Sequence, residues 1–553
     1  MSLKLPSAPN TGLFKPGYQT QSSEDGAVVR NITACREISQ MVRTSVGPCG
    51  RNKIIVNHLG KVFLTSDAAT ILKELDIVHP AAKLMVMASQ QQEAEMGDAT
   101  NLVIILAGEL LNQAENLIRL GLHPSEIIQG YEVAKKHALE VLQECNVDEI
   151  NSFDTVEELN KAVKSAIASK QYGNEEILSN LVSEAILHVL PKHMSNFNVD
   201  NIRVVKVMGS SLESSTVIKG MVFGREPETL VKSVVKSKVA VFTCPVDITS
   251  TETSGTVLLH NAKEMLDFSK GEEAQMEAII KELFDAGVRV IIAGAGLGEL
   301  ALHYLNRYGI LAIKLNSKFD LRRLCRVVGA TPLARLGAPM PEEMGVVDVV
   351  ETIEIGGDRV TVFRQENETT KTATIVVRGA TQNSLDDIER AIDDGVNVIK
   401  SLSKDKRLLP GAGAIEAELV EKIVGYGERT PGLLQHAIKK YGEAFEIIPR
   451  TLAENAGLDA TEVLSRLYAA HSKGTLEGLC VGVDVDDNDG TGVVDAKQAG
   501  IYDLLSAKAS AIGLATDAAT TILSVDQIIM AKRAGGPVMP QQGSGKGNWD
   551  QDD

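Results

Sequence analysis

The sequence is poor in aromatic residues and has no paired cysteines. Of its 553 residues only 4% are Phe, Tyr or Trp, and a single Trp is present. Alanine, valine, isoleucine and leucine must therefore build most of its cores. The six cysteines are scattered without any C-x-x-C pair, so the spacing indicates neither a zinc site nor a disulfide framework. We expect reduced thiols, as in a cytosolic protein.

Positive charge and long apolar runs are also scarce. The chain carries 73 acidic against 56 basic side chains, a net charge of −17. Because phosphate neutralisation requires a cationic surface, we expect no nucleic-acid partner. No uncharged apolar run reaches the roughly 18 residues that a membrane helix needs, and the polar N-terminal stretch does not resemble a signal peptide. We therefore expect no membrane partner and a cytoplasmic location.

The pattern of apolar residues predicts several domains of mixed type. Residues 27–43 have helical spacing, residues 53–66 read as a hairpin, and helices follow up to about 145. Between residues 202 and 314 β-branched runs alternate with helical stretches, which is typical of an α/β domain. Long helices return after residue 382. The predicted order is helical, then α/β, then helical, with the α/β part inserted into the helical one.

This order gives expected boundaries. The two helical ends form one domain, and a connecting layer is crossed twice on the way to and from the inserted part. The expected ranges are 1–145 and 411–530 for the helical domain, 146–216 and 371–410 for the connecting layer, 217–370 for the inserted α/β domain, and 531–553 for a disordered tail.

One glycine-containing loop resembles a phosphate-binding loop but lacks the lysine that such loops usually carry directly after the second glycine. The stretch TSVGPCGRNK spans residues 44–53, and Gly47 and Gly50 would let the backbone approach a phosphate closely. The common phosphate loop ends in Lys-Ser or Lys-Thr, and neither follows here. An ordinary helix-to-strand turn explains the stretch equally well.

Two acidic positions at predicted element ends are also ambiguous. In GDATN (97–101), Asp98 would suit a hard cation beside phosphates, but an aspartate there can simply cap a helix. Asp67, in TSDAATIL, stands at a strand end before a helix and has the same two explanations.

The second half of the chain adds weaker candidates. Gly411 and Gly413 flank Ala412 before a predicted helix, whose N-terminus could receive phosphate or ribose. The adjacent acids Asp393 and Asp394 are as typical of a solvated helix face as of a site. Asp503 could accept ribose hydroxyls or cap a helix.

A further glycine run, Gly294, Gly296 and Gly298, resembles a dinucleotide fingerprint. That fingerprint requires glycine at position 299, where this chain has Glu299. An acid at the start of a helix would repel pyrophosphate, so we interpret the run as a tight turn. An α/β oxidoreductase is accordingly the weakest of the functions considered.

Taken together, the motifs resemble the group II chaperonins. The matching elements are T-S-x-G-P-x-G-x-[ND]-K at 44–53, D-G-A-T-I-L at 67–72, G-D-G-T-[TN] at 97–101, E-R-[SA]-x-x-D at 389–394, G-G-G-A-x-E at 411–416, and the closing A-T-[DE]-A-A element at 515–529. They occur in the family's order over nearly the whole chain. The resemblance implies a multidomain α+β architecture with a mostly helical equatorial domain, a small intermediate domain, and an inserted α/β apical domain that carries a helical protrusion at 244–275.

The resemblance also implies ATP and ADP as ligands, Mg²⁺ as the metal, and ATP hydrolysis as the activity. Asp67 and Asp394 would position and activate the attacking water, Asp394 rather than Asp387 because it keeps the family's spacing, and Asp98 would hold the metal. The implied nucleotide-binding residues are Ser45, Val46, Gly47, Pro48, Asp98, Ala99, Thr100, Asn101, Gly411, Ala412, Gly413 and Asp503. The implied partners are paralogous subunits in two stacked eight-membered rings and unfolded cytosolic clients, with actin and tubulin expected.

This sequence departs from the family at three glycines. Ala68, Ala99 and Ala412 each add a methyl group where the family has glycine. We therefore expect this chain to bind or hydrolyse ATP differently from its ring neighbours. The alternative function is a structural ring subunit that binds nucleotide but contributes little hydrolysis; the retained Asp67, Asp98 and Asp394 oppose it.

Overall fold

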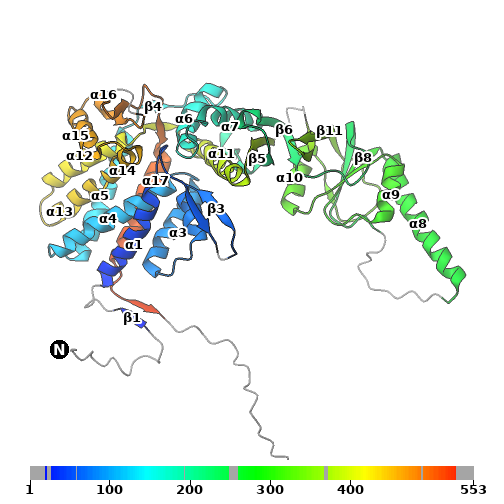
Figure 1. Cartoon of the computed structure of the whole chain (residues 1–553), viewed down its shortest axis with the longest axis horizontal. Coiled ribbons are helices and arrows are strands. Elements are labelled where there is room, and N and C mark those ends of the chain that lie inside the picture. Colours follow the sequence, from blue (N-terminus) through cyan, green and yellow to red (C-terminus); the bar gives the residue numbers. More distant parts are fainter. Residues whose placement is uncertain are drawn as a thin grey trace, which may run out of the picture.

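The computed structural model describes residues 19–21, 27–57, 59–191, 193–247, 260–365, 372–486 and 490–530. Its parts lie in a row, with a helical body at one end, a smaller middle part, and a sheet-rich part at the other end (Figure 1). The chain runs out along this row and returns, because segments from both of its ends share the core of the helical body.

The helical body is built around one apolar helix, α4 (Thr100–Arg119), in which Leu102 to Leu106 are all buried. A helix that is apolar on every side belongs inside a core. It packs against α1 (Ala27–Arg43), α2 (Ala68–Glu74), α3 (Pro80–Glu95), α5 (Pro124–Glu144), α13 (Leu434–Ala444), α14 (Ile447–Ala456) and α17 (Leu505–Leu523), and α12 (Ala414–Arg429) packs on α5 and α13. The predicted helix over 27–43 is confirmed at both ends.

Short strands and helices complete this body. The predicted hairpin is confirmed, with β2 (Lys53–Val56) antiparallel to β3 (Val62–Thr65). The strand β1 (Gln19–Gln21) pairs with β18 (Ile528–Met530). The remaining elements are β4 (Asp148–Glu149), β14 (Arg407–Pro410) and β17 (Tyr502–Leu504), which form one sheet, then β15 (Val481–Val483) paired with β16 (Val493–Asp495), and the helices α15 (Ala460–His471) and α16 (Leu476–Leu479).

The middle part has a separate apolar core between helices and a sheet. Its helices are α6 (Val156–Ala168), α7 (Glu175–Val189) and α11 (Gln382–Leu402), and short 3-10 turns lie at Met194–Asn196, Val199–Asn201 and Leu212–Ser214. The helix α11 contacts α6 on one side and the sheet on the other. A movement of α11 would therefore displace both α6 and the sheet.

One mixed sheet runs from the middle part into the sheet-rich part. Its strands lie in the order β5 (Ile202–Met208), β13 (Ala373–Gly379), β6 (Thr216–Phe223), β12 (Asp358–Arg364), β11 (Gly345–Ile355), β7 (Ser233–Phe242), β8 (Val288–Ala293) and β9 (Leu311–Lys314), with β10 (Pro332–Leu333) beside β7. The expected boundary after residue 216 falls at the start of β6, inside this sheet. The domain boundaries remain predictions.

Three helices flank the sheet-rich part: α8 (Ala262–Asp285), α9 (Glu299–Arg307) and α10 (Lys318–Val328). The helix α8 begins at Ala262, within the range expected for the helical protrusion, and projects beyond the sheet (Figure 1). Residues 248–259 of the predicted protrusion, the tail at 531–553, and most of the N-terminal arm lie outside the described residues.

Candidate functional site

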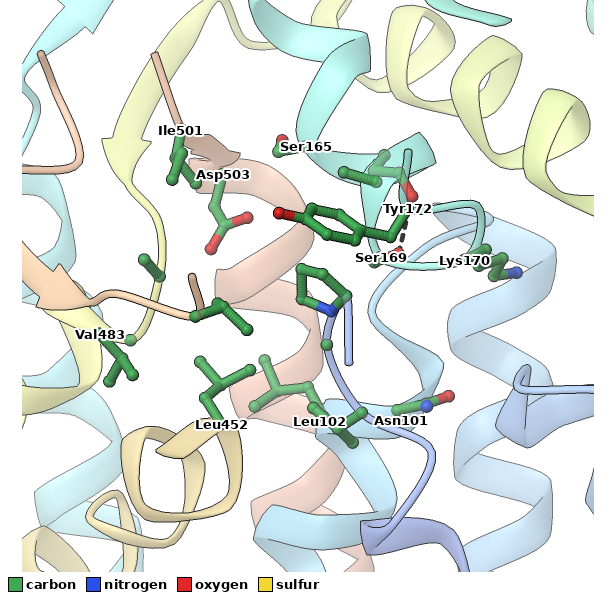
Figure 2. Close-up of a pocket in the computed structure, with 18 of the residues that line it drawn as sticks. Asn101, Leu102, Ser165, Ser169, Lys170, Tyr172, Leu452, Val483, Ile501 and Asp503 are labelled. Carbon is green, nitrogen blue, oxygen red and sulfur yellow. Dashed lines mark hydrogen bonds between the residues drawn. The ribbon is translucent and has the colours of Figure 1, made fainter. Parts of the chain in front are cut away.

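A cavity of about 500 Å³ opens where the helical body meets the middle part. Its walls come from the loop after α1, the turn before α4, the loop between α6 and α7, the turn before α12, and β17. Side chains from these distant segments surround a single space (Figure 2).

The loop after α1 presents its backbone to the cavity. Gly47 has φ +80°, and a Cβ on Gly50 would lie 2.5 Å from the carbonyl oxygen of Ser45, so only glycine fits at position 50. The amide of Asn455 donates to the carbonyl of Val46 at 2.9 Å and fixes the loop from outside. The four residues predicted here, Ser45, Val46, Gly47 and Pro48, all line the cavity.

The turn before α4 leaves the Asp98 carboxylate uncommitted to capping. The N-cap of α4 is Ala99 and makes no side-chain cap hydrogen bond, which removes the capping explanation for Asp98. Oδ1 of Asp98 accepts from the amide of Ala99 at 2.7 Å, and buried Gln92 holds its carbonyl at 3.0 Å. Burial raises the pKa of Asp98, which the Ala99 amide and Lys170 partly oppose.

Asp67 is both an N-cap and part of a charged cluster. It caps α2 by accepting from the amide of Thr70 at 3.0 Å, and Thr100 donates to its other oxygen at 2.9 Å. Burial alone would raise the pKa of Asp67, but Lys170 and these donors lower it to about 2. Asp67 is therefore a fixed anion at any physiological pH.

Asn101 ties three segments of this wall together. Its Oδ1 accepts from the amide of Ala68 at 2.8 Å, and its Nδ2 donates to the carbonyl of Ser66 at 3.2 Å. The junction of β3 and α2 is thereby held against the first turn of α4. Thr100 and Asn101, both predicted, line the cavity.

Asp394 of α11 forms an ion pair with Lys170, which lies in the loop between α6 and α7. The same ammonium lies 3.6 Å from Oδ1 of Asp67. Burial raises the pKa of Asp394 well above its ordinary value; Lys170 opposes the shift, and the carboxylates of Asp98 and Asp67 add to it. Lys170 and Asp394 also line a second cavity of about 350 Å³, in whose wall Asp67 lies. Asp67 itself does not line the first cavity.

Sequence reasoning missed the loop that carries Lys170. Its side chains reach in three directions: Lys170 to the carboxylates above, Gln171 to Asp387 at 2.5 Å, and Tyr172 to Asp486 at 2.5 Å. Nothing in the stretch SKQYGN marks it as a site, because its partners lie far away in sequence. The only signal was a lysine in a short glycine-containing loop between two amphipathic helices.

The opposite wall contains the GAG turn and β17. Ala412 has φ 55° and Gly413 φ 78°, and the carbonyl of Ala412 accepts from the amide of Val483 at 2.8 Å. Ala412, Gly413 and Asp503 line the cavity; Gly411 does not, and its amide instead bonds to the carbonyl of Ile501 at 3.0 Å. Asp503 directs its carboxylate into the cavity (Figure 2).

Residues 38–533 match the TCP-1/cpn60 chaperonin family. The chain belongs to this family. It is 63% identical to T-complex protein 1 subunit theta of Saccharomyces cerevisiae, 61% to the probable T-complex protein 1 subunit theta of Schizosaccharomyces pombe, and 50% to the human theta subunit, and each match covers both chains completely.

Two stretches of this chaperonin chain already pointed to that subunit type. KELDIVHPAAKLM (73–85) and VDQIIMAKRAGGP (525–537) resemble the theta subunit of the eukaryotic cytosolic chaperonin, and the relatives bear this out. Among the described residues, no helix is long and apolar enough to cross a membrane.

The three departures from the chaperonin glycines are not equivalent. Ala99 and Ala412 both have left-handed backbones, with φ of 63° and 55°, where an alanine is strained and glycine is not. Ala68 instead begins α2, is fully buried, and does not line the cavity. The methyl group of Ala68 therefore lies in the core of the helical body and not in the cavity wall.

The donors present fit one Mg²⁺ only together with a ligand. Within the described part of the chain, no three His, Cys, Asp or Glu side chains gather to hold a metal by themselves. Mg²⁺ usually binds proteins through one or two carboxylates plus substrate phosphates and water. Asp98, which lines the cavity and caps no helix, suits that arrangement.

The glycine run near residue 296 is not a second nucleotide site. Gly298 caps α9, and a Cβ there would meet the Asp247 side chain at 2.7 Å. Glu299 occupies the first turn of the helix. Two acids at this helix start would repel a phosphate, so the interpretation as a tight turn is retained.

Proposed function

We propose that this chain is an ATP-binding and ATP-hydrolysing subunit of a hetero-oligomeric chaperonin that folds cytosolic proteins. The observation that carries the proposal is the cavity described above. There a glycine loop and Asp98, which caps no helix, face the Lys170–Asp394 ion pair, and the two sides belong to separate cores. Phosphoryl transfer to water needs fixed phosphates, neutralised charge and an aligned nucleophile, and these groups can supply each.

The phosphate side would be held by backbone groups. Gly47 and Gly50 bring the loop close, and the start of α4 at Thr100 adds the positive end of a helix dipole. Asp98 would hold Mg²⁺, which neutralises charge on the phosphates when bound. No lysine in the loop is required, because Lys170 reaches the same space from the other core.

The two catalytic candidates have different electrostatics and therefore different roles. Asp394 has a raised pKa, which suits a general base that takes a proton from water. Asp67, with a pKa of about 2, is a poor base and serves as the fixed anion that holds Lys170. As Lys170 and Asp394 separate, the carboxylate of Asp394 becomes free to accept that proton.

The position of Asp394 connects the reaction at the cavity to the arrangement of the sheet. It lies on α11, which contacts β5 and β13 of the long sheet. A change at the cavity can thus reach the sheet-rich part, where we propose that clients such as actin and tubulin bind.

Assembly is supported by an exposed apolar hairpin. Ile54, Val56 and Leu59 on the β2–β3 hairpin are 70%, 63% and 78% exposed. Exposed apolar groups of this kind mark contacts between proteins. We propose that they contact paralogous subunits within two stacked eight-membered rings in the cytoplasm.

A structural subunit with little hydrolysis is the second candidate. The strained Ala99 and Ala412 favour it, because each places a methyl group beside the cavity. The intact Asp98, Asp394 and Asp67 oppose it.

Substitution of Asp394 in this chain alone tests the two candidates. In the assembled particle, this chain is photo-labelled with azido-ATP carrying an isotopic γ-phosphate. Wild type should lose the γ-label over time, and Asp394→Asn should retain it, with hydrolysis at this site slower by about 10²–10⁴-fold. A wild-type chain that keeps its γ-label as long as the variant does would support the structural role. A chain that takes no label competed by ATP would refute both.

A further inference from the structure

One buried lysine at the cavity has no role in the reaction described above. Lys508 lies in the first turns of α17, and its side chain is 13% exposed. Its ammonium forms an ion pair with Glu416 of α12 and lies 3.1 Å from Oδ2 of Asp503. It therefore links two helices to the one carboxylate of β17 that faces the cavity.

The lysine is held charged by its surroundings. Burial alone would lower the pKa of Lys508, but Asp503 and Glu416 keep it above its ordinary value. Glu416 is 2% exposed, and among the described residues its Oε2 has no hydrogen-bond partner, so its ion pair with Lys508 compensates that buried charge. A charge at this depth, near the positive end of α17, is costly unless it is paired.

Asp503 needs such a support to hold one orientation. Its backbone is fixed by pairing with Leu409 in β14, but its side chain is 31% exposed and projects into open space (Figure 2). Within the described chain, Lys508 contacts this carboxylate through Oδ2. A carboxylate held by one oxygen presents the other in a defined direction.

We propose that Lys508 is a positioning residue that makes this site selective for ribonucleotides. It fixes the Asp503 carboxylate so that this group accepts hydrogen bonds from the ribose hydroxyls. The inference rests on the proposed nucleotide binding and adds a specificity to it. A site arranged to bond a hydroxyl discriminates against the analogue that lacks it. Because the bond is to a charged group, we expect ADP to bind about 10-fold or more tightly than 2′-deoxy-ADP.

A purely structural role of Lys508 predicts a different result. If it only joins α12 to α17, its loss weakens binding of both nucleotides equally. Lys135 offers a matched control, because it also forms an ion pair with α17, at 2.6 Å to Asp517, yet does not line the cavity. Lys135→Met should leave the ratio of the two affinities unchanged.

The test measures competition in the assembled particle. Azido-ADP labels this chain, and ADP or 2′-deoxy-ADP competes. Lys508→Met should reduce the preference for ADP to near unity by weakening ADP alone, Asp503→Asn should do the same, and the double variant should add nothing. Lys508→Arg, which retains the charge, should keep most of the preference.

Two results would overturn the inference: no preference for ADP in the wild type, or an unchanged ratio in Lys508→Met. If Lys508→Met does not assemble, Lys508→Met combined with Glu416→Gln, which leaves no unpaired buried charge on α12, decides in its place, and an unchanged ratio there overturns the inference as well. Labelling that ADP does not compete in any variant would instead refute the proposed function.

Discussion

The cavity has two kinds of wall. The body wall, made of residues 45–48, Ser66 and residues 98–102, is held by backbone hydrogen bonds and by Asn101. The bridge wall, made of residues 169–172 and Asp394, has local backbone bonds to the end of α6, but side-chain contacts join it to distant segments, chiefly Lys170 to Asp394 and Tyr172 to Asp486. Ion pairs can change partners when a charged ligand enters, whereas a network that completes helix ends cannot. The body wall is therefore suited to bind, and the bridge wall to move.

The largest effect should come from breaking the bridge wall at Lys170. Lys170→Met leaves two buried carboxylates, Asp394 and Asp67, without their cation, and such a loss costs about 3 kcal/mol or more. The bridge wall should then open, and amide hydrogen exchange in residues 169–174 should rise by about 100-fold.

Lys164→Met is the control for that experiment. Lys164 also lines the cavity, but it is 44% exposed and lies 3.6 Å from an exposed glutamate, Glu176. Its loss should change the exchange of the same amides by less than about threefold. Equal exchange in the two variants would contradict the distinction between the walls.

The body wall should depend most on Asn101. Asn101→Ala leaves the amide of Ala68 and the carbonyl of Ser66 without this partner, at a cost of about 2 kcal/mol. Exchange should rise in residues 66–70 and remain unchanged in residues 169–174. Asn112→Ala, on the same helix with only weak bonds of 3.3–3.4 Å to Glu109, should have little effect. A rise in both walls would show that they are not independent.

Replacing each of the three alanines by glycine should change stability in opposite directions, upward for Ala99 and Ala412 and downward for Ala68. Ala99→Gly and Ala412→Gly relieve a left-handed alanine and should each stabilise the protein by up to about 1 kcal/mol. Ala68→Gly removes a buried methyl group from a helix and should destabilise by about 1 kcal/mol. Thermal melting of the assembled particle measures all three. A loss of stability in Ala99→Gly would show that its backbone is not strained.

The body wall could be predicted from sequence because its parts are local. Gly47 and Gly50 announce a turn within one stretch, and GDATN lies directly before α4. The bridge wall could not be predicted from sequence, because Lys170 and Asp394 meet only through the packing of α6 on α11. The order of helical and sheet-rich parts followed from periodicity.

The smallest expected effect is on the alkylation rate of Cys49, whose thiol lies beside both walls. Burial and Asp486 raise the pKa of Cys49, so its alkylation should be slow at neutral pH and rise about tenfold per pH unit below that pKa, since the thiolate is the reactive form. Cys244, also partly exposed with a raised pKa, lies far along the chain in the sheet-rich part and serves as the internal reference.

Nucleotide should slow the alkylation of Cys49 relative to Cys244, because Cys49 follows Pro48 in the loop that lines the cavity. If Lys170→Met opens the bridge wall, the same ratio should rise without nucleotide, since Tyr172 and Asp486 then no longer meet beside the thiol. Faster reaction of both thiols would indicate general loosening, and an unchanged ratio would place the moving contact elsewhere than the bridge wall.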